Sequence, residues 1–271
     1  MTPLENGPRL DVVVLTSGMI GVEVAARLAG HPAVATVSLI TAPAVPGGDR
    51  LFPKLRRIHR YDGTQGLVHA AVKRLARLLY LIPRFRLADA IAGRCPGVRH
   101  LHFSDFHDRA CLEHLRASAP HLGVVADTYR LLPAVFSIPR MGCVNLHLGK
   151  LPEFRGASPG FYELLEGVDE VGVTIHRVTG ALDGGSILRQ ETFPLDLGPE
   201  GDPLEYLRRY QAEVLVANGA RMMAETVAGL ARGDQGEQPQ APSRARPRRR
   251  ATWARKRELR RVVAQRRAGS N

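Results

Sequence analysis

The sequence predicts an α/β protein with a doubly wound, mostly parallel sheet, and three observations support this fold class. Residues 10–15 form a continuous apolar run, which is typical of a strand buried on both faces. A Thr-Ser-Gly turn at residues 16–18 leads into a stretch with apolar residues at helical spacing. Residues 34–41 have the composition of a second buried strand. Strand, helix and strand in this order form the βαβ unit of parallel sheets.

The alternation of strands and helices continues along the second half of the chain. Apolar runs predict strands, and apolar residues three and four positions apart predict helices. We expect strands at residues 98–103, 122–127 and 172–178, a further strand that ends near Asn145, and helices at residues 108–117 and 203–231. Strands separated by helices favour a parallel sheet with helices on both faces.

Residues 50–94 interrupt this alternation, and we interpret them as a basic helical insertion. Residues 52–88 hold nine Lys or Arg and one acid. Apolar residues recur at helical spacing within them, namely Val68, Val72, Leu75, Leu79 and Ile82, and Pro83 is expected to end the helix. One interpretation packs this apolar stripe onto the body of the protein, and the other places it on anionic lipid or a partner.

The composition changes again at residue 233, so we place a catalytic domain at residues 1–232. Residues 241–271 contain 12 Lys or Arg and one acid, Glu258. Such charge blocks are usually solvated, and we expect residues 233–271 to be a disordered basic tail. An anionic partner, either nucleic acid or a membrane surface, would neutralise the tail and could induce a helix at residues 251–266.

Composition excludes several protein classes. The chain has 271 residues and lacks a charge-free apolar run of about 18 residues, so no transmembrane helix is expected. Its first residues lack the pattern of a secretory signal. The three cysteines, Cys95, Cys111 and Cys143, are scattered without C-x-x-C spacing. We therefore expect neither a disulfide framework nor a zinc site, and we expect a cytoplasmic location.

One pattern of polar residues indicates a catalytic site. Asn145 and His147 lie at the end of a predicted buried strand, and Asp183 lies in a Gly-rich turn after the next strand. Functional crevices of open α/β sheets lie at the carboxyl ends of the strands. An amide and an imidazolium can stabilise a developing oxyanion while a carboxylate governs proton transfer, as acyl transfer requires. No Ser or Cys nucleophile is needed if the substrate brings an amine.

Three stretches resemble the folate-dependent formyltransferases. They are residues 145–156, residues 173–178 and residues 182–188, and the resemblance extends roughly over residues 9–43 and 95–195. That family includes glycinamide ribonucleotide, methionyl-tRNA and nucleotide-sugar N-formyltransferases. The resemblance implies a Rossmann-like formyltransferase fold. It also implies transfer of a formyl group from 10-formyltetrahydrofolate to a primary amine, without a metal.

The resemblance also implies roles for individual residues. Asn145 and His147 would stabilise the oxyanion, and Asp183 would keep the imidazole protonated and take part in proton transfer. His176 would hold the loop that contains Asp183 in position. An equal alternative is that His176 is a histidine of the core. Arg155 would meet an anionic part of the acceptor, or would be a solvated loop residue.

The folate and acceptor sites follow from the same resemblance. Two segments would sandwich the pterin ring, one formed by Tyr129, Arg130, Leu131 and Leu132, the other by Ala181, Leu182 and Asp183. Ser17 and Gly18 could offer backbone N–H groups to a phosphate at a helix N-terminus.

The acceptor is less well defined by the sequence. Gly149 and Lys150 replace a common Ser-Leu pair, and this form resembles proteins of sugar or secondary metabolism. We therefore expect a small-molecule acceptor: an amino sugar nucleotide first, then an amino acid derivative, then a ribonucleotide amine. The alternatives are a 10-formyltetrahydrofolate hydrolase and a non-catalytic binding protein. The resemblance permits a homodimer, and residues 52–88 and 241–271 could contact an anionic surface.

Overall fold

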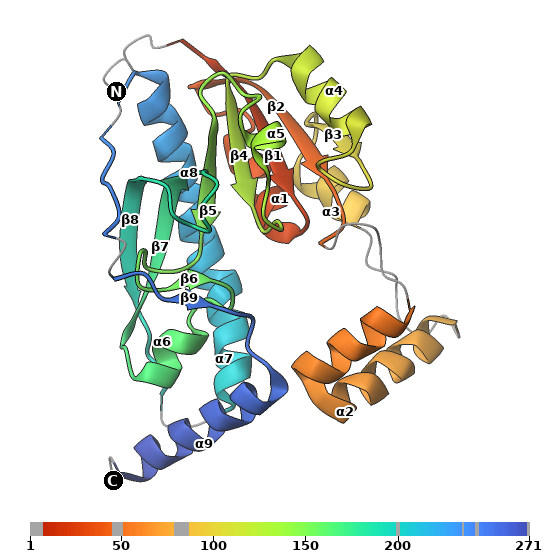
Figure 1. Ribbon diagram of the computed structural model, residues 1–271, viewed down its shortest axis with the longest axis vertical. Coiled ribbons are helices and arrows are strands. Elements are labelled where there is room, and N and C mark those ends of the chain that lie inside the picture. Colours follow the sequence, from red (N-terminus) through yellow and green to blue (C-terminus); the bar gives the residue numbers. More distant parts are fainter. Residues whose placement is uncertain are drawn as a thin grey trace.

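A seven-stranded sheet forms the centre of the protein (Figure 1). The computed structural model describes residues 8–44, 51–78, 87–198, 201–234, 236–241 and 244–269. In spatial order the strands are β3 (Arg99–His102), β2 (Val34–Thr41), β1 (Leu10–Thr16), β4 (Leu122–Ala126), β5 (Cys143–His147), β7 (Glu170–Arg177) and β8 (Ile187–Pro194).

The strand pairing confirms the predicted doubly wound, mostly parallel sheet. The strands from β3 to β5 are parallel, whereas β7 pairs antiparallel with both β5 and β8. Chain order runs outward in one direction from β1 to β3 and in the other direction from β4 onward. Ligands bind at the carboxyl ends of strands near such a reversal.

Helices cover both faces of the sheet. One apolar core includes side chains of α1 (Met19–Leu28) and α8 (Val216–Ala231), which contact each other. The other core includes side chains of α4 (Arg109–Ser118) and α5 (Pro133–Phe136). Because helices cover both faces of the sheet, an inner strand can be apolar along its whole length. In β4, for example, every residue is buried.

The predicted helix at residues 203–231 is present as three joined segments. They are α7 (Pro203–Tyr210), a π-helical turn (Gln211–Leu215) and α8. The Asp202 carboxylate accepts hydrogen bonds from the backbone N–H groups of Leu204 and Glu205 and so caps α7.

The insertion is helical, as expected, but its apolar stripe is not packed on the body. It forms α2 (Leu51–Leu78), which bends at Gly63, and α3 (Leu87–Arg94), which packs on α1. Val68, Val72 and Leu75 are 64%, 58% and 58% exposed. The rest of the predicted stripe, together with the expected helix end at Pro83, lies outside the described residues.

The basic tail is folded, so the prediction of disorder was wrong. Its β9 (Pro247–Arg248) pairs with β6 (Arg155–Gly156), and α9 (Trp253–Gly269) contacts α6 (Phe161–Glu166) and α7 (Figure 1). Leu259 and Val263 lie one helical turn apart and are buried. These few apolar residues anchor the helix, although the composition around them is highly charged.

Candidate active site

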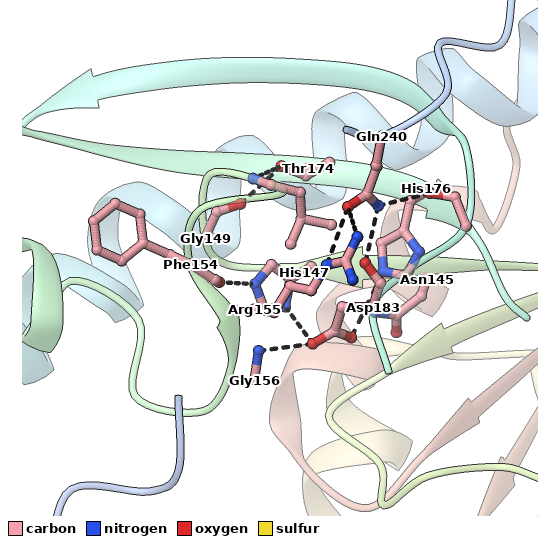
Figure 2. Close-up of polar contacts among 12 residues, drawn as sticks. Asn145, His147, Gly149, Phe154, Arg155, Gly156, Thr174, His176, Asp183 and Gln240 are labelled. Atoms are coloured by element: carbon pink, nitrogen blue, oxygen red, sulfur yellow. Dashed lines mark hydrogen bonds and ion pairs between the residues drawn. The ribbon is translucent and has the colours of Figure 1, made fainter. Parts of the chain in front are cut away.

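The sheet brings Asn145, His147 and Asp183 to one place. Asn145 and His147 lie two residues apart on β5, and their side chains therefore project from the same face of the strand. Asp183 lies in the loop between β7 and β8. Its carboxylate oxygens are 3.7 Å from His147 Nδ1 and 3.8 Å from His176 Nε2. Figure 2 shows Asp183 beside both imidazoles.

Asp183 is held by its own backbone and by a neighbouring loop. Its φ of 45° is left-handed, a conformation that Asp adopts more readily than bulky residues. The backbone N–H of Gly156 donates a 2.8 Å hydrogen bond to one carboxylate oxygen. A charge-assisted bond of this kind fixes the carboxylate on the side that faces His147.

His147 is buried and its ring orientation is fixed. Nε2 donates a 2.7 Å hydrogen bond to the carbonyl oxygen of Phe154. Since that bond occupies Nε2, the other ring nitrogen is the one that faces Asp183. A proton on Nδ1 would point toward the Asp183 carboxylate, 3.7 Å away.

His176 orients the Asn145 amide. The two residues are directly opposite in the β5–β7 pair, and Asn145 Nδ2 lies 3.0 Å from His176 Nε2. Burial lowers the pKa of His176 to about 4, so its ring is neutral at physiological pH. Nδ1 donates to the Arg177 carbonyl oxygen at 2.8 Å. His176 Nε2 is then an acceptor for one amide hydrogen of Asn145, which leaves the other amide hydrogen available.

A pocket of about 100 Å³ opens beside these residues. Most residues that were predicted to hold the pterin line it: Tyr129, Arg130, Leu131, Ala181, Leu182 and Asp183. Leu132 follows this wall, half exposed, and is not among the lining residues. Asn145 and His176 form the inner end. The Arg130 guanidinium donates to the Gly180 carbonyl oxygen and so ties the two walls together.

Ser17 and Gly18 lie at the end of β1, outside that pocket. Their backbone N–H groups donate to the Asp127 carbonyl oxygen at 3.0 Å and to Thr16 Oγ1 at 3.1 Å. A Cβ at Gly18 would collide with the Asp127 carboxylate, whose pKa is raised by burial. The two predicted phosphate donors are therefore engaged within the protein, and a carboxylate lies next to them.

Gln240 is a site residue that the sequence did not indicate. Its amide nitrogen donates to the carbonyl oxygens of Asp183 and Gly185 at 2.9 and 2.7 Å. Its amide oxygen accepts two bonds from Arg155, at 3.2 and 2.6 Å (Figure 2). Arg155 thus joins the tail to the site instead of projecting freely into solvent. A single Gln in a Gly/Gln/Pro stretch has no periodicity or motif that would have revealed it.

The active-site strap, defined as residues 236–241 and 244–251, includes Gln240 and contacts both Ile187 and residues 155–157. Gln238 and Ile187 exchange two backbone hydrogen bonds of 2.8 Å. Arg248 accepts a backbone bond from Ala157, and its carbonyl oxygen lies so close to Gly156 that a Cβ there would collide with it. The strap therefore fixes the glycine that donates to Asp183.

A buried carboxyl group, Glu163, lines the same small cavity as His147. Burial raises the pKa of Glu163 to about 7. Its Oε1 and Arg248 Nε are buried without a hydrogen-bond partner among the described residues. Both residues line a cavity of about 10 Å³, which His147 also lines and which is roughly the size of one water molecule.

Within the described ranges, no group of three or more His, Cys, Asp or Glu residues could hold a metal ion. The same residues contain no helix long and apolar enough to cross a membrane.

A Rossmann-like sheet that presents an amide, an imidazole and a carboxylate beside a pocket has the geometry of an acyl-transfer site. Comparison with known proteins makes this specific. The family model for formyl transferases matches residues 83–218, half of the chain. The chain belongs to the formyl transferase family.

Individual relatives agree with that assignment. A methionyl-tRNA formyltransferase of Parabacteroides distasonis is 38% identical over 134 residues, which are 49% of this chain and 39% of that protein. The match thus spans about two fifths of that curated relative. Glycinamide ribonucleotide transformylase 1 from Symbiobacterium toebii has a TM-score of 0.55 at 25% identity, covering 87% of this chain and 95% of its own.

A third structure shares the fold. It is WlaRD, a sugar 3N-formyl transferase determined with dTDP and 5-N-formyl-THF. Its TM-score is 0.54 at 13% identity, and the match covers 90% of this chain and 71% of that one.

Proposed function

We propose that the protein transfers a formyl group from 10-formyltetrahydrofolate to a primary amine. The observation that carries this proposal is that Asn145 and Asp183 line the pocket whose walls match the expected pterin-binding segments, with His147 Nδ1 3.7 Å from the Asp183 carboxylate. Family membership supports the same reaction class. The relative crystallised with 5-N-formyl-THF supports a reduced folate as the formyl donor.

The pocket would place the formyl carbon next to Asn145. The amine nitrogen attacks that carbon, and the carbonyl oxygen becomes an oxyanion. The amide hydrogen of Asn145 that is not bonded to His176 donates to the oxyanion, and the His147 imidazolium stabilises it electrostatically. The bond between the formyl carbon and folate N10 then breaks. The amine gains the formyl group and loses a proton, and N10 receives a proton.

Asp183 has two roles in the proposed reaction: it stabilises a positive charge and it accepts a proton. Its carboxylate stabilises the charged His147 ring and can accept the proton that the attacking amine loses. Only 14% of its side chain is exposed, and the weak solvent screening there makes its interaction with the imidazolium stronger than a surface pair.

We propose a small-molecule acceptor, with an amino sugar nucleotide favoured over an amino acid derivative and a ribonucleotide amine. The engaged N–H groups at Ser17 and Gly18, with the Asp127 carboxylate beside them, disfavour a phosphate at this helix N-terminus. The Asp127 carboxylate favours a hydroxyl or ammonium group of the acceptor at this position. A tRNA acceptor, as in the methionyl-tRNA relatives, is the competing class. Cytoplasmic location and a homodimer stay predictions from the sequence.

The test is a product analysis with 10-formyltetrahydrofolate and a panel of amines. We expect tetrahydrofolate release to depend on an amine and the amine to gain one formyl group by mass spectrometry. Equal release with and without amines, accompanied by formate, would identify the hydrolase alternative instead. No consumption of the folate with any amine would contradict formyl transfer.

A further inference from the structure

Two helices carry a formal charge equal to the net charge of the whole protein. α2 contains seven Lys or Arg and one acid, and so does α9. Each helix thus carries a formal charge of +6, and together they account for the whole +12 of the chain. The remaining residues, including the catalytic site, balance to zero.

The two helices are far apart in sequence but touch in space. Trp253, at the start of α9, packs against the bend at Gly63 of α2. Lys256 Nζ lies 2.5 Å from the Asp62 carboxylate, and the Arg250 guanidinium lies 4.9 Å from the centre of the Tyr61 ring. In Figure 1, α2 and the start of α9 lie together beyond the sheet. We call α2 and α9 the basic module.

The basic module also exposes apolar side chains. Val68, Val72 and Leu75 are spaced by four and three residues, so they lie on one face of the second half of α2. All three are more than half exposed. Leu55, in the first half of the same helix, is 40% exposed. An apolar stripe left in water on a strongly basic helix is typical of interfacial membrane helices.

We propose that the basic module binds an anionic lipid surface, with the stripe of α2 inserted among the acyl chains. The exposed arginines Arg56, Arg60 and Arg74 of α2 would contact lipid phosphates, and Arg257 and Arg261 of α9 would extend that contact. Nucleic acid would satisfy the charge but gives no reason to expose valine and leucine. This inference does not depend on the formyl transfer reaction.

The test uses the full-length protein and vesicles of phosphatidylcholine with or without phosphatidylglycerol. We expect sedimentation with the anionic vesicles only, weakened by added salt because exposed charges are screened. Val72→Asp should weaken that binding roughly tenfold, since it removes an apolar contact and adds a repelled charge. Val72→Leu should strengthen it. Ala117→Asp, which adds the same charge at an exposed position of α4, is the matched control and should bind like the parent apart from a small general charge effect.

Thermal unfolding separates these effects from misfolding, because an exposed residue should change stability little. No binding to anionic vesicles would overturn the proposal, as would equal loss in Val72→Asp and Ala117→Asp. Binding of unfractionated tRNA that competes with vesicles and is unaffected by Val72→Asp would also overturn it, in favour of a nucleic-acid surface.

Discussion

At the scale of single residues, the site depends on how tightly Asp183 is fixed. Its carboxylate accepts from Gly156, its carbonyl oxygen accepts from Gln240, and its φ is left-handed. Its charge, together with this position, is what stabilises the His147 imidazolium in the proposed reaction.

Asp183→Asn keeps the size and the acceptor oxygen of the side chain but removes its charge. We expect the variant to fold and to lose roughly two orders of magnitude in turnover number, because both imidazolium stabilisation and proton transfer fail. Steady-state formyl transfer measures this. Asp196→Asn, on an exposed carboxylate, is the control. Near-normal turnover in Asp183→Asn would remove Asp183 from the mechanism.

Glu163 gives a prediction for stability. Its pKa rises from 4.5 to about 7 on folding, so the folded state favours the protonated form. The resulting stabilisation is present below pH 4.5 and is lost as pH rises through about 7. Glu163→Gln removes this loss. The free energy of unfolding of Glu163→Gln, measured relative to that of the parent, should therefore increase from pH 5 to pH 8, by about 3 kcal/mol at most.

Denaturant unfolding at several pH values measures that difference. Glu113→Gln, at an exposed position of α4, should show a nearly constant difference from the parent over the same range. A pH-independent difference for Glu163→Gln as well would show that Glu163 is not buried as described.

At the scale of elements, the active-site strap positions the loop that carries Asp183. We expect Gln240→Ala to lower the turnover number about tenfold while the Kd for folate changes little, because the loop that carries Asp183 loses two hydrogen bonds outside the pocket. Gln238→Ala is a matched control, since its exposed side chain lies two residues away and its backbone bonds remain. Equal effects of the two substitutions would leave Gln240 without a positioning role.

The elements also show where sequence reasoning succeeds. β1 and β4 are buried on both faces, so their apolar runs predicted them directly. The motif residues Asn145 and His147 lie on β5, and Asp183 follows β7. Because β7 is antiparallel to β5, the loop after β7, and not parallel topology, places Asp183 beside the two imidazoles. The contribution of the tail could not be predicted, because Gln240 acts through backbone carbonyls, a contact that leaves no pattern in the sequence.

At the scale of the whole molecule, α9 joins the basic module to the catalytic body. Leu259 is fully buried, and α9 contacts α6 and α7. Leu259→Ala should therefore lower the free energy of unfolding by about 3 kcal/mol, the usual effect of a core cavity. Gln265→Ala, on an exposed position of α9, should change it by less than about 0.5 kcal/mol. A Leu259→Ala variant as stable as the parent would mean that the tail does not pack on the body.

The whole account depends on a reduced folate entering the pocket between residues 128–131 and 178–183. Calorimetric titration with the stable analogue 5-formyltetrahydrofolate tests this most directly, using the parent and Ala181→Trp. Ala181 is exposed at the pocket wall, so a Trp there should fill the pocket without unfolding the protein. The account predicts binding by the parent and none by Ala181→Trp at equal thermal stability. No binding by the parent, or equal affinity of the two proteins, would contradict it.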